Sequence, residues 1–322
     1  MSKLDRFFVS EDGIWCTNPN KVKEAFFKHF EARFKKPVNH RLKINFLFSK
    51  RLSDVQASDL ERRVSRDEIR LVVWNCGENK SPGPDGYSFK FFRKYWNLVG
   101  SDLCDAAEHF FETGSFPNGC NSSFVALIPK IMDAKFVNDF WPISLIGSVY
   151  KVVTKVLANR LALVILDLIS DTQSAFVANR QILDGPFILN ELLHWCKRKK
   201  KQVMFFKVYF AKAYDSVRWD YLLDVLEAFG FGNIWCKWIS RTFSSAKASV
   251  LVNGSPTIEF PFHCGLKQGD PLSPYLFILI MESLNMSFTR AIDEGVFKGV
   301  HLHGSTSISH LFYADDVMFI GE

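Results

Sequence analysis

The stretch that decides the fold is Ile308-Ser309-His310-Leu311-Phe312-Tyr313-Ala314-Asp315-Asp316-Val317-Met318-Phe319-Ile320. Two adjacent carboxylates lie between two apolar, β-prone runs, and this pattern predicts a β-hairpin with the acids at its tip. Two carboxylates on a rigid turn can hold Mg²⁺, which prefers oxygen ligands. Aspartate is also common in turns that bind nothing. The segment therefore predicts a hairpin, and a metal site is one of two interpretations of its acids.

The bulk composition is that of a folded protein with a large apolar interior. The chain has 322 residues, of which 48% are hydrophobic and 15% aromatic. This length allows one large domain or two closely associated ones. The formal net charge of +6 is compatible with a nucleic-acid partner but does not require one.

Cysteine usage and the absence of long apolar stretches bear on the compartment. The seven cysteines contain no Cys-x-x-Cys pair, so we expect no zinc site and a reducing environment. The N-terminus lacks the apolar core of a signal peptide, and the longest apolar stretch, 275–281, is too short to cross a bilayer. We expect an intracellular protein, nuclear or cytoplasmic, that is neither secreted nor membrane-bound.

The N-terminal third shows clear helix signals. Asn18-Pro19 is a typical helix start, and Val22, Phe26, Phe30 and Phe34 then repeat every four residues, which predicts a helix that docks through one apolar face. Further on, Ser65-Arg66-Asp67-Glu68 has the pattern of a capping box.

The remaining patterns alternate between helices and strands. Beyond the capping box we expect helices at 89–96, 101–113, 148–169, 182–199, 217–229, 233–243 and 271–292. We expect strands at 123–129, 141–146, 203–208, 248–252 and 256–260. Asn253-Gly254 between the last two is a strong hairpin signal. This order predicts an α+β fold with antiparallel pairing rather than a doubly wound sheet.

Several motifs occur in a familiar order along the chain. They are Lys80-Ser81-Pro82-Gly83-Pro84-Asp85-Gly86, Ile128-Pro129-Lys130, Pro142-Ile143-Ser144-Leu145, Phe206-Lys207-Val208-Tyr209-Phe210-Ala211-Lys212-Ala213-Tyr214-Asp215, Gly265-Leu266-Lys267-Gln268-Gly269-Asp270-Pro271-Leu272-Ser273-Pro274 and the Asp-Asp turn. From about Trp15 to Gly321, the chain resembles reverse transcriptases of non-LTR (LINE-type) retrotransposons, and plant members most closely. The resemblance implies a right-hand polymerase with fingers and palm. Such an enzyme copies an RNA template from a DNA primer with dNTPs.

The resemblance also implies a metal site. In this family one palm strand supplies an aspartate and the neighbouring hairpin supplies two more, which together hold two Mg²⁺. By motif matching, Asp315 and Asp316 take the hairpin positions, with Asp315 as the direct metal ligand. The strand position, however, is Tyr209, where the family pattern is Phe-Lys-Val-Asp-Phe.

A tyrosine at this catalytic position predicts an impaired enzyme. A phenol is neutral at pH 7 and cannot bridge two Mg²⁺ as a carboxylate does. The expected loss of rate is on the order of a thousandfold or more. Asp215, six residues further on, is expected to cap the next helix rather than to substitute. The alternative is a sequencing error or a single-base change, because aspartate and tyrosine codons differ by one base.

Two other departures from the family pattern remove cations. Trp141 stands where the family has an arginine expected to contact the triphosphate, and Cys264 stands where it has another arginine. An indole cannot form the charge-assisted bonds that arginine makes to phosphate. Together with Tyr209, these losses indicate decay of the polymerase, and a structural reason for all three is the alternative.

Other positions of the substrate site are retained. Tyr214 corresponds to the aromatic residue that blocks a ribose 2′-hydroxyl, and Ala213 beside it is assigned to the same site. The alternative for Tyr214 is a core aromatic residue. Gln268 and Gly269 are expected to line the nucleotide pocket, although Gly-Asp-Pro is also an ordinary turn before a helix. Lys130 is expected at the triphosphate, or else on the solvated surface.

A basic run and the chain ends complete these expectations. Lys197-Arg198-Lys199-Lys200-Lys201 can contact template or primer phosphates, or simply complement a helix dipole. We expect an N-terminal helical extension and linker at 1–60, a fingers-like region at 61–200 and a palm at 201–322, with the thumb and endonuclease absent. The predicted protein is a truncated, impaired reverse transcriptase. The alternatives are a non-catalytic nucleic-acid-binding relic and a purely structural one.

Overall fold

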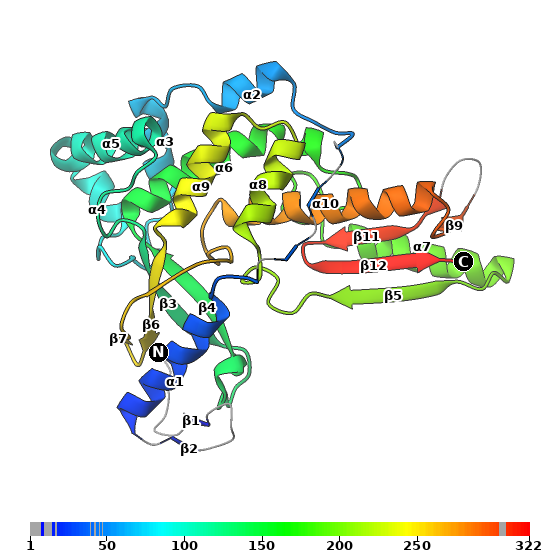
Figure 1. The fold of residues 1–322 in the computed structure, drawn as a ribbon, viewed down its shortest axis with the longest axis horizontal. Coiled ribbons are helices and arrows are strands. Elements are labelled where there is room, and N and C mark those ends of the chain that lie inside the picture. Colours follow the sequence, from blue (N-terminus) through cyan, green and yellow to red (C-terminus); the bar gives the residue numbers. More distant parts are fainter. Residues whose placement is uncertain are drawn as a thin grey trace.

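The structure is a computed structural model that describes residues 8–9, 15–16, 18–38, 40–41, 43–44, 46, 48–302 and 307–322 (Figure 1). The helices are α1 (Pro19–Arg33), α2 (Asp54–Leu60), α3 (Arg66–Asn75), α4 (Phe89–Lys94), α5 (Trp96–Thr113), α6 (Ser148–Leu168), α7 (Asp184–Lys199), α8 (Trp219–Ala228), α9 (Asn233–Ser244) and α10 (Ser273–Asp293), with a 3₁₀ turn at Val137–Asp139. The strands are β1 (Phe8–Val9), β2 (Trp15–Cys16), β3 (Ser122–Pro129), β4 (Phe140–Ile146), β5 (Met204–Tyr209), β6 (Lys247–Val252), β7 (Ser255–Pro256), β8 (Phe260–Pro261), β9 (Val300–His301), β10 (Ser307–Ile308), β11 (His310–Tyr313) and β12 (Asp316–Gly321).

One sheet carries the acidic hairpin. Its strand order is β11-β12-β5, and both pairings are antiparallel. Tyr313 lies opposite Asp316, so the hairpin turn consists of Ala314 and Asp315 alone. On the other side of β12, Asp316 lies opposite Tyr209. The predicted hairpin, with its acids at the tip, is confirmed.

The second large sheet has the order β4-β3-β6-β7, with β8 also paired to β6. The predicted strands at 123–129 and 141–146 are confirmed as β3 and β4, which pair antiparallel. The predicted turn between β6 and β7 is also confirmed, and Asn253 and Gly254 there both have positive φ (52° and 78°). The expected antiparallel pairing holds in the acidic sheet, but it is wrong for one pair of the second sheet, because β3 and β6 are parallel. Such a pair joins segments that are far apart in the chain and needs no tight turn between them, so no turn motif in the sequence predicts it.

Helix α1 docks on this second sheet through the predicted apolar face. Phe26, Phe30 and Phe34 are buried in a cluster with residues of β3, β4, β6 and β8. The Phe34 ring stacks on Phe262 with 4.1 Å between centroids. The last turn of α1 therefore lies beside the segment that leads into α10.

The largest core cluster joins the helices around α6 to the acidic hairpin, and it contains a buried ion pair. Ser65 Oγ accepts a hydrogen bond from Glu68 N (3.2 Å), as in a capping box. The reciprocal half of the box is not formed. Instead the Glu68 carboxylate accepts two bonds from Arg160 (2.9 and 2.8 Å), a guanidinium that is only 2% exposed. The predicted capping box is therefore only half formed. The reason is that leaving the buried Arg160 cation without a carboxylate would cost more free energy than losing the second capping bond.

Helices cover both sides of the acidic sheet. Figure 1 shows α10 running along β11 and β12, with α7 behind them. Leu192 and Cys196 of α7 are buried with Ile320 of β12, towards the C-terminal end of that strand. Within the described ranges, no helix combines the length and the apolar character needed to cross a membrane.

A buried lysine connects the loop before α10 to the start of β3 and to α6. Lys267, 3% exposed, donates through Nζ to Asn121 O (3.2 Å) and Oδ1 (2.8 Å) at the start of β3. Its ammonium group also lies 4.0 Å from the centre of the Tyr150 ring, and the Tyr150 hydroxyl donates to Asp270 Oδ2 (3.2 Å). Burial lowers the pKa of Lys267 to about 7.

This lysine makes stability depend on pH. The folded-state pKa of about 7 lies below the ordinary value of 10.5, so the unfolded chain holds the proton more tightly. The contribution of Lys267 to stability is therefore complete above pH 10.5 and is lost as the pH falls towards 7. We predict that the free energy of unfolding of the wild type, relative to Lys267→Met, rises between pH 7 and pH 10. Urea denaturation of both proteins at several pH values measures this difference in the free energy of unfolding. A difference that stays the same at every pH would contradict the prediction.

Candidate active site

The acidic turn has a backbone conformation that its sequence disfavours. Ala314 has φ of 51°, a left-handed conformation that two-residue hairpin turns normally assign to glycine, asparagine or aspartate. Its N–H donates to Gln173 Oε1 (3.1 Å), which also accepts from Ala175 N (3.0 Å). Gln173 is 2% exposed, so the turn is stabilised by a hydrogen bond to a buried side chain.

The loop that carries Gln173 is bonded to the hairpin along its backbone. Phe312 N donates to Thr172 O (2.8 Å), and Ser174 N donates to Phe312 O (3.1 Å). These bonds extend the edge of the sheet by one bridge beside β11, between Gln173 and Phe312. The glutamine is thereby placed directly under Ala314.

A buried polar network fastens the same loop to α10. Asn285 Nδ2 donates to Ser170 Oγ (2.8 Å) and to Glu282 Oε1 (2.7 Å). Burial lowers the pKa of His310 to about 4, so this imidazole is neutral at pH 7 and donates through Nε2 to Asn285 Oδ1. Neither Gln173 nor this network can be recognised in the sequence, because single polar residues in a loop form no repeating pattern of apolar and polar positions.

The two hairpin acids have different surroundings. Asp315 lines a pocket, whereas Asp316 lies 3.3 Å from Lys207 Nζ in an ion pair along the sheet. Tyr209, directly opposite Asp316, is 70% exposed. Among the described residues there is no group of three or more histidine, cysteine or acidic side chains that could hold a metal ion. This donor set does not fit a two-metal site, since a third carboxylate is missing and one of the remaining two is paired with a lysine.

The pocket beside Asp315 has a volume of about 370 Å³ and brings together distant parts of the chain. All the predicted substrate-site residues line it, together with two of the three altered positions of the family pattern, whereas Cys264 does not line it. These residues are Lys130, Trp141, Tyr209, Ala213, Tyr214, Gln268 and Gly269. Their placement in one pocket was predicted from motifs alone, and their roles remain predictions. Arg33, Phe176 and Lys212 also line the pocket and were not anticipated.

The wall formed by Gln268 and Gly269 touches β4. Ser144 N donates to Gln268 O (2.7 Å), and Gly269 has φ of 100°. A Cβ atom at Gly269 would lie 3.1 Å from Ser144 O. Glycine is needed at this point because a side chain would push β4 away from the loop.

Tyr214 lies between the core and the pocket. Its ring stacks on Phe277 of α10, with 4.5 Å between centroids and 16° between planes, and it also lines the pocket. Burial raises the pKa of its hydroxyl well above the usual value, so the phenol stays neutral.

Asp215 does not cap the following helix, contrary to the prediction. Helix α8 starts after Arg218 without a side-chain cap. Asp215 is buried, its Oδ2 lies 2.5 Å from Arg33 Nη2, and its Oδ1 accepts from Gln268 Nε2 (3.4 Å). Burial raises the pKa of Asp215, and the Arg33 charge counteracts this. Burying a carboxylate without a cation would be costly, so α1 docking and the Asp215 turn depend on each other.

Cys264 packs against the same turn. Its Sγ lies 3.6 Å from Asp215 O and 3.5 Å from Lys35 O. In this chain the cation beside Asp215 is Arg33 of α1. A basic residue at the end of an amphipathic helix was the only sequence signal for Arg33.

The basic run lies away from the pocket. It ends α7, and Lys201 forms an ion pair with Glu322 just beyond β12. Asp315 and Asp316 are at the opposite end of that strand. The run and the pocket are thus separate features, and its proposed phosphate contacts remain a prediction.

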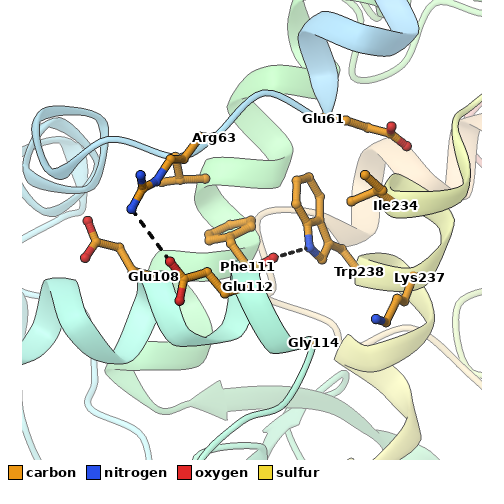
Figure 2. A pocket seen from close by; sticks show the side chains of 10 residues that line it. Glu61, Arg63, Glu108, Phe111, Glu112, Gly114, Ile234, Lys237 and Trp238 are labelled. Carbon is orange, nitrogen blue, oxygen red and sulfur yellow. Dashed lines mark hydrogen bonds and ion pairs between the residues drawn. The ribbon is translucent and has the colours of Figure 1, made fainter.

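A second pocket, of about 420 Å³, lies between α5, α9 and the segment after α2 (Figure 2). Figure 2 shows carboxylates around an aromatic floor in which Trp238 donates to Phe111 O (2.9 Å). The charged residues that line it are Glu61, Arg63, Glu108, Glu112 and Lys237. An excess of carboxylates does not suit a polyphosphate, so the pocket at Asp315 is the candidate active site.

Comparison with known proteins agrees with this assignment. Residues 128–322 match the family described as reverse transcriptase (RNA-dependent DNA polymerase). The chain belongs to the reverse transcriptase family. As a family these enzymes use divalent metal ions. Helix α1, with Arg33, lies outside the residues that match this family.

The relatives are proteins of non-LTR retrotransposons. The chain is 30% identical over 271 residues to the Transposon TX1 uncharacterized 149 kDa protein of Xenopus laevis, which covers 84% of this chain and 20% of that protein. It is 26% identical over 244 residues to the Retrovirus-related Pol polyprotein from type-2 retrotransposable element R2DM of Drosophila melanogaster. This match covers 76% of this chain and 22% of that protein. The predicted family is therefore confirmed, and the chain spans about a fifth of the length of these relatives.

A plant protein is also similar over a short stretch. An uncharacterized mitochondrial protein of Arabidopsis thaliana is 45% identical over 67 residues, which is 20% of this chain and 55% of that protein. This similarity agrees with the plant-type resemblance of the motifs.

We predict that Gln173→Leu destabilises the fold by about 2 kcal/mol, because two buried N–H groups lose their acceptor. Urea denaturation at pH 7 measures the change. Gln202→Leu, an exposed loop position after α7, is the matched control and is expected to change stability by less than about 0.5 kcal/mol. Equal effects of the two substitutions would show that Gln173 does not support the turn.

Proposed function

We propose that this chain is the fingers and palm part of a LINE-type reverse transcriptase whose nucleotidyl transfer is impaired. RNA template, DNA primer and dNTPs are the substrates that the family implies. The observation that carries the proposal is Tyr209, which lies opposite Asp316 and on the wall of the pocket beside Asp315. This is the place where a two-metal polymerase needs a carboxylate.

The physical reason for the impairment is a missing negative charge. Two Mg²⁺ ions would activate the primer hydroxyl and neutralise the triphosphate in such an enzyme. Because position 209 carries a phenol and Asp316 is paired with a lysine, Asp315 is the carboxylate of the described site without such a partner. The expected cost is on the order of a thousandfold in rate.

A second candidate function is nucleic-acid binding without catalysis. The exposed Trp141 and Tyr209 favour it, since aromatic rings at these positions contribute contact surface but no catalytic charge. Binding to a primed RNA template should then weaken as salt rises, because phosphate contacts release counterions.

Primer extension tests the first proposal. We predict that Tyr209→Asp raises single-nucleotide addition on a primed RNA template, in Mg²⁺, about a thousandfold over the unmodified chain. Adding Asp315→Asn to this variant should abolish the gain, and Tyr209→Phe is the matched control without a carboxylate.

The outcomes separate the candidates. Fast addition by the unmodified chain, lost in Asp315→Asn, would show that Tyr209 is tolerated and that the impairment is not real. If neither the chain nor Tyr209→Asp adds a nucleotide while salt-dependent template binding persists, the second candidate replaces the first.

A further inference from the structure

The charges around the pocket are balanced differently from those of a two-metal site. Three of its lining residues are cationic, namely Arg33, Lys130 and Lys212, and we call them the cationic wall. Arg33 is paired with Asp215 and Lys207 with Asp316, so Lys130 and Lys212 remain beside the carboxylate of Asp315, and the formal charge of the pocket and these pairs is one positive. An aspartate at position 209 would cancel that charge.

Two of the three positions that depart from the family pattern, together with Phe176, place exposed rings at this pocket. Trp141 is 53% exposed, Tyr209 is 70% exposed and Phe176 is 49% exposed, and all three line the same pocket. We call them the aromatic wall. Single exposed aromatic residues are ordinary, but three that converge on one cavity indicate a ligand with a flat apolar face.

The backbone is strained at two of the residues that line the pocket. Phe176 and Lys212 both have φ of 58°. A bulky residue in the left-handed region costs free energy, and such conformations cluster where a side chain must be aimed at a ligand. Each wall therefore contains one residue held in a disfavoured conformation at the pocket.

We propose that this pocket binds a nucleoside triphosphate without a metal ion. The phosphates lie against the cationic wall, where charge-assisted hydrogen bonds replace metal contacts. The base lies against the aromatic wall, because stacking on a ring accepts any base. The proposal rests on the proposed function only for the class of ligand. It assigns to Tyr209 and Trp141 a role in binding the base, at positions where the family has charged residues.

Titration of the full chain with a fluorescent deoxynucleoside triphosphate in EDTA tests the proposal. We expect saturable binding that Trp141→Ala weakens about tenfold. Phe206→Ala is the matched control, since Phe206 is an exposed ring of β5 outside the pocket. Inorganic triphosphate should compete, but about tenfold more weakly than the nucleotide because it lacks a base.

Charge variants test the other wall. Lys212→Ala should weaken binding of both the nucleotide and inorganic triphosphate about tenfold, whereas Lys28→Ala on the exposed side of α1 should not. Tyr209→Asp should weaken binding in EDTA about tenfold and regain it in excess Mg²⁺, while Tyr209→Phe binds like the wild type. Arg33 is left unchanged because it pairs with buried Asp215. Circular dichroism confirms that each variant is folded.

Three results would overturn the proposal. They are binding by the unmodified chain that requires Mg²⁺, no binding in either condition, and equal affinity for inorganic triphosphate and nucleotide with Trp141→Ala unchanged. Because the titration needs no chemical step, failure of Tyr209→Asp to extend a primer would count against the proposed function and leave this inference intact.

Discussion

The strained turn at Ala314 and Asp315 is the constraint on which the site depends. Its left-handed alanine is held by Gln173, and Gln173 is placed by a loop that is bonded both to β11 and, through Ser170 and Asn285, to α10. If this support moved, Asp315 would leave the pocket wall. On its other edge β12 pairs with β5, in a register that places Tyr209 opposite Asp316.

The pocket itself is built from pieces that are distant in sequence. The end of α1 contributes Arg33, β4 meets the loop before α10 through Ser144 and Gln268, and the turn after β5 contributes Asp215 beneath them. The ion pair between Arg33 and Asp215 ties α1, which lies outside the family match, to the centre of the site. An N-terminal helix is thus part of the pocket in this member of the family.

The substitution at Tyr209 changes what this pocket can do electrostatically. A polymerase site concentrates carboxylates so that metal ions can neutralise the triphosphate. Here one carboxylate is replaced by a phenol and another is paired with Lys207, so lysine and arginine side chains outnumber acids. In our proposal, the walls of this pocket contact phosphates and a base directly.

The sequence by itself determined the features that local patterns encode. The acidic hairpin, the docking face of α1 and the turn at Asn253 and Gly254 follow from alternation, a four-residue repeat and turn chemistry within a few residues. The ordered motifs also predicted which residues meet in the pocket. The tertiary structure alone decided the parallel pairing of β3 with β6, the partners of Arg160 and Asp215, and the role of Gln173. These are contacts between distant segments, chosen because a buried charge or a buried N–H must find a partner wherever the fold provides one.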